Sequence, residues 1–268
     1  ENYWQLSFLV LGLIVLFSSL ALFFVPEKSS NSRELSQKIN DEKLYEKFKL
    51  KNHVTKFFAW LYGTVVSPLI SFFKKNSASV AIGLLSFIFL FKIGEAFLGR
   101  MSIIFYKELG FSKTDIALYS KGIGWITTIT FTLLGGLFAI RMGLFKAMLI
   151  SGIIMALTNL MFSVLAWVGS SEILFAFTVL IDDLAAAFAT VAFVAFISAL
   201  VDRNYTATQF ALLASIGTAG RTLFASSSGA LVDWLNGDWG IFFIISAVMV
   251  IPSLICLMAI KDKLKLNE

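Results

Sequence analysis

Seven charged side chains lie within the apolar runs of this sequence, and they are the residues best able to do chemistry. A charge in the hydrocarbon core of a membrane is costly, so such residues usually pair with one another or line a water-filled passage. Four of the seven are positive and three are negative, and we expect them to pair around a shared cavity. They are Lys92, Glu95, Arg100, Lys121, Asp182, Asp183 and Arg221.

Lys92 and Glu95 are three residues apart, so they share one face of a helix. One interpretation is an ion pair that only holds two helices together. The other is that Glu95 takes up a proton during a transport cycle and so releases Lys92 to bind an anionic substrate. Both interpretations stay open, and we assign Glu95 to proton coupling and Lys92, together with Lys121, to substrate binding as hypotheses.

Asp182 and Asp183 are adjacent, so their side chains point about 100° apart on a helix and only one can face a cavity squarely. We favour Asp182 as the cavity residue and as a second proton-coupling site. Arg221 needs a carboxylate partner from the protein or from a substrate, and we assign it to substrate binding. It follows Gly217 and Gly220, whose small size allows helices to approach closely and can serve packing alone.

Four aromatic side chains near these charges could stack against a sugar ring: Trp125, Tyr119, Phe91 and Phe97. Lipid contact or helix packing is the simpler explanation for most of them, and we keep only Trp125 as a substrate-binding candidate. His53 and Cys256 are single, so the sequence has no His/Cys metal cluster and no nucleophile–base pair within a span. We therefore expect no cofactor, no metal ion and no enzyme activity.

Long apolar helices must position these residues. Apolar residues make up 58% of the 268 positions and charged residues only 15%, whereas a soluble domain has about half apolar and about a quarter charged residues. A membrane span needs about 20 mostly apolar residues. We therefore predict an all-α protein embedded in a lipid bilayer, with seven spans at 3–25, 78–106, 115–140, 144–168, 173–201, 209–234 and 240–260.

One connection between the predicted spans is long and charged. Residues 26–56 are rich in Lys, Glu, Ser and Asn, which predicts a solvated linker. The stretch 54–75 is aromatic and apolar but ends at Lys74 and Lys75. This pattern favours a helix that lies along the membrane interface, with an extra short span as the alternative.

The basic residues predict an orientation in the membrane. Of the 22 Lys and Arg residues, 16 fall on one side of the seven-span arrangement, and only Lys107 and Lys113 fall on the other. By the positive-inside rule, the linker and the C-terminus are cytoplasmic and Glu1 is outside. Since the basic residues gather at helix ends, the net charge of +5 does not indicate a nucleic-acid partner.

One span, a long basic linker and six further spans resemble the major facilitator superfamily, in which two six-helix halves are joined by a cytoplasmic loop. The segment from Gly136 to Gly143, with Arg141, resembles the loop signature of that superfamily. Ile140 stands where an acidic residue is usual, so the charge-pair gate of that loop is in question. The resemblance otherwise implies that Gly136, Arg141 and Gly143 form a gating loop.

Three segments are similar to the AmpG-type muropeptide permease family, namely 66–73, 92–97 and 206–221. Lys121 and Asp182 also match a basic and an acidic position of that family. The resemblance implies a proton-coupled secondary transporter that imports anhydro-muropeptides, which are small anionic glycopeptides, across the bacterial inner membrane. In that case residues 1–25 are helix six of the N-terminal half, 26–77 are the linker and interfacial helix, and 78–268 are the C-terminal six-helix bundle.

The chain would then be the C-terminal part of a transporter, and its partner would be the N-terminal half of the same protein. A transporter of the same fold for another anionic solute, such as acetyl-CoA or a peptide, is an alternative. A seven-helix receptor or photoreceptor also has seven spans and an outside N-terminus, but the linker after the first span argues against it. An intramembrane enzyme lacks the residues it would need.

Overall fold

The computed structural model describes residues 2–22, 24, 61–62, 66–122, 124–202 and 205–264 of the chain. The chain forms two compact units, Glu1–Ala59 and Trp60–Glu268. The described helix of the first unit is α1 (Asn2–Leu22), which matches the first predicted span. The predicted linker over 26–56, and much of the predicted interfacial helix before residue 66, lie outside the described residues.

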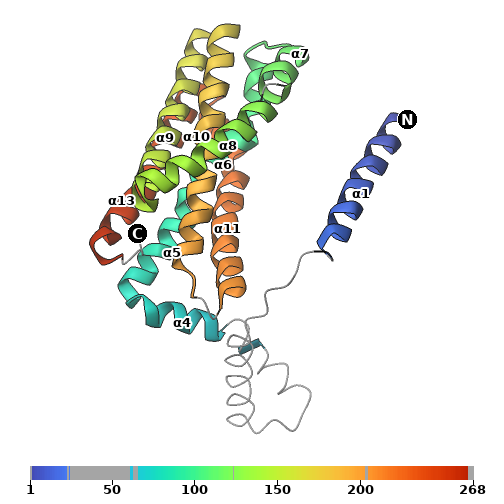
Figure 1. The fold of residues 1–268 in the computed structure, drawn as a ribbon. Coiled ribbons are helices and arrows are strands. Elements are labelled where there is room, and N and C mark those ends of the chain that lie inside the picture. Colours follow the sequence, from blue (N-terminus) through green and yellow to red (C-terminus); the bar gives the residue numbers. More distant parts are fainter. Residues whose placement is uncertain are drawn as a thin grey trace. The chain divides into compact units, whose positions relative to one another are not determined.

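The second unit is a helical bundle in which each predicted span corresponds to one helix or to consecutive helices (Figure 1). Only α9 has the same bounds as its predicted span, 144–168, and the others differ by a few residues at their ends. The elements are α4 (Ser67–Lys75), α5 (Ala78–Phe91), α6 (Ile93–Glu108), α7 (Lys113–Asp115), the π-helix η2 (Ile116–Gly122), α8 (Gly124–Met142), α9 (Leu144–Val168), α10 (Glu172–Leu200), α11 (Thr206–Trp234), α12 (Trp239–Val248), α13 (Ile251–Ile260) and the 3₁₀ turn η3 (Lys261–Lys263).

Short breaks that contain glycine separate several of the helices. Gly143, between α8 and α9, has φ of 78°, and Gly169, after α9, has φ of 90°. Other residues rarely adopt such angles, so glycine allows a sharp turn at both points. Ser171 and Asp238 then accept hydrogen bonds from the backbone N–H groups that begin α10 and α12, at 3.5 and 3.0 Å.

Within the described residues, five helical stretches are long and apolar enough to cross a membrane, fewer than the seven predicted. They are Ala78–Glu108, Lys113–Met142, Leu144–Val168, Glu172–Leu200 and Trp239–Lys263. The apolar part of α1, Gln5–Ala21, is shorter. The helix α11 has 29 residues but carries Thr218, Arg221, Thr222 and Ser226 exposed along its length, so it is too polar to qualify. The sixth predicted span is therefore a long helix with a polar face.

The bundle core consists of two clusters in which aromatic side chains pack with aliphatic ones. One cluster contains Phe72, Phe87 and Phe196, and the other contains Phe105, Phe175 and Trp239. Helix α10 packs between α8 and α9, while α11 packs on α5 and α6. Phe91 and Phe97, considered above as sugar-stacking residues, are 0% and 1% exposed and belong to this core, so that interpretation is wrong for both.

The helix α4 is fastened to the turn between α10 and α11 by polar contacts. The Gln209 side chain accepts a hydrogen bond from the Asp202 N–H at 2.6 Å and donates one to the Pro68 carbonyl at 2.8 Å. Ser71 donates to Asp202 at 3.0 Å, and Lys75 donates to the Leu200 carbonyl at 3.2 Å. A segment that the sequence indicates only as an amphipathic helix is thus held against the end of the bundle.

Replacing Gln209 with Leu is expected to loosen α4. Gln209 is 2% exposed, and Leu would leave the Asp202 N–H and the Pro68 carbonyl without their partner, at a cost of about 1–3 kcal/mol. Hydrogen exchange of 67–75, measured by mass spectrometry on the chain in detergent, should become faster. Gln209→Glu keeps the acceptor but sets a buried carboxylate oxygen against the Pro68 carbonyl, so it should also make this exchange faster. Unchanged exchange in Gln209→Leu would show that α4 is held by its apolar side chains alone.

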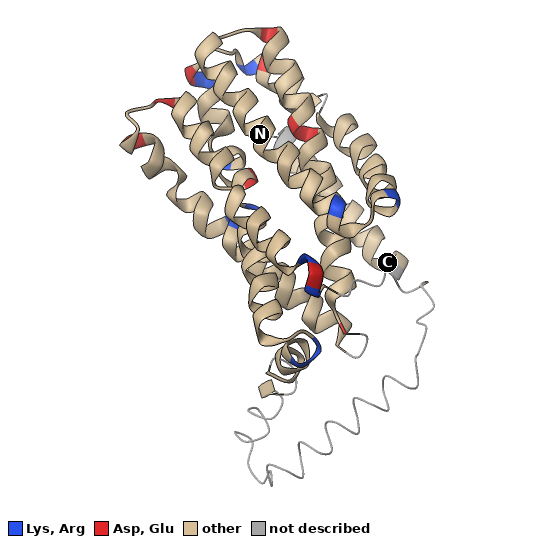
Figure 2. Ribbon diagram, turned by 90° about the vertical axis from the view of Figure 1, so that its left-hand side faces the viewer, with Lys and Arg blue, Asp and Glu red and all other residues tan. Residues whose placement is uncertain are grey.

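Several basic residues share the end of the bundle at which α4 lies. Lys75 contacts the last carbonyls of α10, and the Lys261 ammonium lies 5.9 Å from the Phe145 ring at the start of α9. Figure 2 shows charged residues toward the helix ends and a smaller number part-way along the helices. The predicted grouping of these basic residues at one end is present, whereas the side of the membrane that this end faces stays a prediction.

Candidate functional site

Three of the charged residues selected from the sequence form one connected cluster. The Lys92 ammonium donates a hydrogen bond to Glu95 Oε2 at 2.7 Å and another to Thr190 Oγ1 of α10 at 2.9 Å. On the opposite side, Arg221 Nη2 of α11 lies 3.4 Å from Glu95 Oε1. Glu95 is therefore a single carboxylate shared between two cations that come from different helices.

The backbone is distorted where this cluster begins. Lys92 separates α5 from α6, with φ of −87° and ψ of 9°, so the long span changes direction at that residue. Such interruptions within a membrane helix are tolerated where neighbouring polar groups or a cavity compensate for them. The break places the Lys92 side chain toward α10 while Glu95, in the first turn of α6, reaches α11.

The strengths of the two contacts to Glu95 differ. Lys92 and Glu95 have side chains that are mostly buried, whereas the Arg221 side chain is 49% exposed. A short, shielded ion pair is held more firmly than a long, solvated one, because water screens the latter and competes for its hydrogen bonds. Arg221 is therefore the cation that can most easily exchange Glu95 for another anion.

The adjacent aspartates of α10 point in different directions, as expected from their spacing. Asp182 accepts a hydrogen bond from Thr158 of α9 at 3.1 Å, while Asp183 accepts one from Thr127 of α8 at 2.7 Å. Asp183 is the member of the pair that lines a cavity of about 430 Å³ beside η2. At this cavity the lining residue is thus Asp183 and not Asp182, which the sequence favoured.

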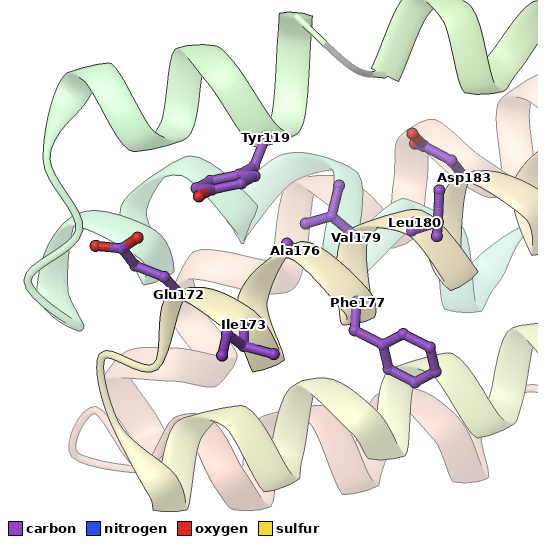
Figure 3. A pocket seen from close by; sticks show the side chains of 8 residues that line it. All are labelled: Tyr119, Glu172, Ile173, Ala176, Phe177, Val179, Leu180 and Asp183. Carbon is purple, nitrogen blue, oxygen red and sulfur yellow. The ribbon is translucent and has the colours of Figure 1, made fainter.

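Figure 3 shows this cavity between η2 and the first half of α10. The Tyr119 ring lies between Glu172 at one end and Asp183 at the other, with Ala176 and Val179 beneath it. Its wall is mostly apolar. Among the four aromatic residues considered above, Tyr119 is the one that lines this cavity.

The predicted gating loop surrounds a second cavity, of about 660 Å³. Gly136, Arg141 and Gly143 all line it, together with Lys146 at the start of α9 and Val191 of α10. Arg141 lies in the last turn of α8, and Ile140 is exposed beside it. The structure thus brings the three residues of the predicted loop together, and their role in gating stays a prediction.

Comparison with known proteins indicates what kind of protein carries this arrangement. The chain is 30% identical over 262 residues to the AmpG 4 transporter of Rickettsia felis. The aligned region covers 98% of this chain and 58% of the Rickettsia protein. It is 31% identical over 202 residues to the anhydromuropeptide permease of Escherichia coli K12, covering 75% of this chain and 40% of the permease. This chain is a relative of the AmpG-type permeases.

The family inferred from the sequence motifs is confirmed by these relatives. The AmpG 3 transporter of Rickettsia prowazekii is also similar, with 31% identity over 201 residues, 74% of this chain and 47% of that protein. No family model matches the chain. The chain spans about half the length of the relatives it matches, and with its apolar helices it is a membrane protein of this transporter group.

The sequence also assigns Lys121 and Trp125 of this AmpG-type chain to substrate binding. Lys121 belongs to η2, and its side chain lies outside the described part of the structure. Trp125 is on the first turn of α8, is exposed, and lines neither of the two cavities just described. Within the described residues, no group of His, Cys, Asp or Glu side chains is arranged to hold a metal ion.

Several polar residues of the site were not selected from the sequence. Thr190 contacts Lys92, and Thr127 and Thr158 each contact one of the adjacent aspartates. Threonines are common in membrane helices and usually bond to their own backbone, as Thr127 and Thr158 also do here. The useful signal would have been a threonine placed one helix away from a buried charge, which requires the packing to be known.

Proposed function

We propose that this chain forms the C-terminal half of a proton-coupled importer of anhydro-muropeptides in the bacterial inner membrane. The observation that carries the proposal is the Glu95 carboxylate shared between Lys92 and Arg221. The name of one relative, the anhydromuropeptide permease of Escherichia coli, supports the muropeptide as cargo. The linker and C-terminus are proposed to be cytoplasmic, because basic residues gather at that end.

In this mechanism the Glu95 carboxyl group either carries a proton or is ionised and contacts both Lys92 and Arg221. When Glu95 is protonated it loses its negative charge, so Lys92 and Arg221 are left with positive charges that need another anion. A carboxylate of the cargo then takes the place of Glu95, and the proton and the cargo are bound together. Rocking of the two halves about this site carries both across the membrane.

The polar face of α11 supports the need for a second half. Thr218, Arg221 and Thr222 are exposed on this helix, although it packs on α5 and α6 along its other side. Such a face is unstable against lipid, since its polar groups would lose hydrogen bonds to water. We propose that it faces a water-filled passage closed by the N-terminal half, with Lys121 and Trp125 placed along the same passage.

Asp182 is proposed as a second coupling residue, distinct from Asp183. Its carboxylate is held by Thr158 between α9 and α10, within the bundle. Asp183 is held by Thr127 of α8 and lines the cavity of Tyr119 instead. Protonation of Asp182 would therefore affect its contact with α9, whereas protonation of Asp183 would affect its contact with α8.

Replacing each aspartate with Asn in the full-length transporter should separate these roles. Asp182→Asn is expected to flatten the pH dependence of uptake, because an amide cannot exchange a proton. Asp183→Asn keeps an oxygen that accepts from Thr127, so uptake should stay within about threefold of wild type, with the same pH profile. A flattened profile in Asp183→Asn and an unchanged one in Asp182→Asn would reverse the assignment.

The cargo is tested by competition for uptake. Cells that lack their own permease but express the full-length transporter should accumulate labelled anhydro-muropeptide, faster at lower external pH. Excess unlabelled anhydro-muropeptide should abolish this uptake, whereas acetyl-CoA and an unrelated acidic peptide should not. Stronger competition by acetyl-CoA or by the peptide would show that this competitor, and not the muropeptide, is the cargo.

A further inference from the structure

A third cavity, of about 420 Å³, lies between α6 and α11 and is lined by two arginines. Arg100 of α6 and Arg221 of α11 both line it. Its volume is within the range of sites that hold small molecules, roughly 300–1,000 Å³. The remaining lining residues are small or hydroxylic, namely Ala96, Gly99, Thr218, Thr222, Ala225 and Ser226.

The charges of this cavity are not balanced by its own wall. None of the described residues that line it is Asp or Glu. Arg100 is exposed and makes no ion pair with any described residue, while Arg221 has only its 3.4 Å contact with Glu95. Two guanidiniums on one cavity wall within a membrane bundle form a site that an anion would stabilise.

The hydroxyl groups of the cavity already donate their protons elsewhere. Thr218 donates to the Ala214 carbonyl at 2.9 Å, Thr222 donates to the Thr218 carbonyl at 2.8 Å, and Ser226 donates to the Leu223 carbonyl at 2.7 Å. While these hydrogen bonds are kept, the hydroxyl oxygens act as acceptors. Donors for an anion therefore come from the two arginines, and the hydroxyl oxygens suit the N–H or O–H groups that adjoin it.

From this geometry we infer that Arg100 and Arg221 form an oxyanion site that binds the terminal peptide carboxylate of the cargo between α6 and α11. The inference rests on the proposed function for the identity of the cargo and adds Arg100 to its binding residues. Guanidinium groups suit a carboxylate because they can form two parallel hydrogen bonds with it. Arg221 reaches both Glu95 and this cavity, so cargo binding here competes with its contact to Glu95.

Gly99 lies beside the Arg221 side chain in this site. A Cβ added at Gly99 would meet Arg221 Nη2 at 3.6 Å, which is ordinary van der Waals contact. Alanine therefore fits beside the guanidinium, whereas a leucine at this position would occupy the space where the guanidinium lies. Gly99→Leu should weaken carboxylate binding while Gly99→Ala should not, although neither variant removes a charge.

The carboxylate preference is tested with a matched pair of cargo molecules, an anhydro-muropeptide with a free C-terminal carboxylate and its C-terminal amide. The full-length transporter should take up the acid at least about tenfold faster, and Arg100→Gln should reduce this ratio to near one. Lys107→Gln removes a positive charge two turns further along α6, outside the cavity, and should keep the ratio. Arg100→Lys, which keeps the charge but not the fork of donors, should give an intermediate ratio.

A binding measurement on the purified chain separates this inference from the proposed function. The chain has five arginines, and the side-chain NMR signals of Arg100 and Arg221 should shift when an N-acetylated dipeptide is added but not when its C-terminal amide is added. If these NMR signals shift but the full-length transporter takes up no muropeptide, the proposed cargo is wrong and the carboxylate site still stands. An unchanged acid-to-amide ratio in Arg100→Gln, or stronger shifts with inorganic phosphate than with the dipeptide, would overturn the carboxylate site.

Discussion

Glu95→Gln in the full-length transporter is expected to lower muropeptide uptake about tenfold or more and to remove its dependence on external pH. The amide cannot exchange a proton, and it leaves Lys92 and Arg221 without the anion that they share. Removing one partner of a fully buried ion pair costs roughly 3–5 kcal/mol. Glu95 is partly exposed, so the loss of folding stability should be smaller than this.

Two variants control this experiment. Glu95→Asp keeps an exchangeable carboxylate and should keep a pH-dependent profile at a reduced rate, because the shorter side chain lengthens both contacts. Asp233→Asn makes the same chemical change at an exposed position near the end of α11 and should transport like wild type. Undiminished uptake by Glu95→Gln, with the pH profile of wild type, would remove Glu95 from proton coupling.

Gly220→Ala is expected to prevent normal packing of α11 against α5. A Cβ at this position would overlap the backbone carbonyl oxygen of Phe89, and backbone cannot move aside as a side chain can. Overpacking usually costs about 1–3 kcal/mol, and a clash with backbone belongs at or above the upper end of that range. The thermal unfolding temperature of the chain in detergent, and its yield, should fall clearly.

Gly229→Ala is the matched control on the same helix. The nearest atom to a Cβ there is the end of the flexible Met101 side chain, at 3.6 Å, so alanine fits. Alanine also favours the helix over glycine by roughly 0.5–1 kcal/mol, so this variant should be as stable as wild type or slightly more so. If Gly220→Ala were equally stable, α5 and α11 could not approach each other as closely as the structure shows.

For the glycines before Arg221, the sequence predicts a packing role but not the residues that they contact. The small size of Gly217 and Gly220 predicted a packing role, and both lie at contacts of α11, with Phe193 near Gly217 and Phe89 near Gly220. The partner residues were not predictable, because small residues permit close approach without specifying which helix approaches. The same limit applies to Lys92, whose partner Glu95 is close in sequence and was predicted, whereas Thr190 is distant and was not.

The amino-acid sequence by itself determined the membrane class, the helices and the family. These depend on the length and apolar content of single segments, which a bilayer selects one helix at a time, and on local motifs. Only the tertiary structure decided which partner each charged side chain finds on another helix: Arg221 with Glu95, Asp182 with Thr158, and Asp183 with Thr127. Side-chain partners on different helices depend on how each helix is rotated and shifted against its neighbours, and that is set by the packing of the whole bundle.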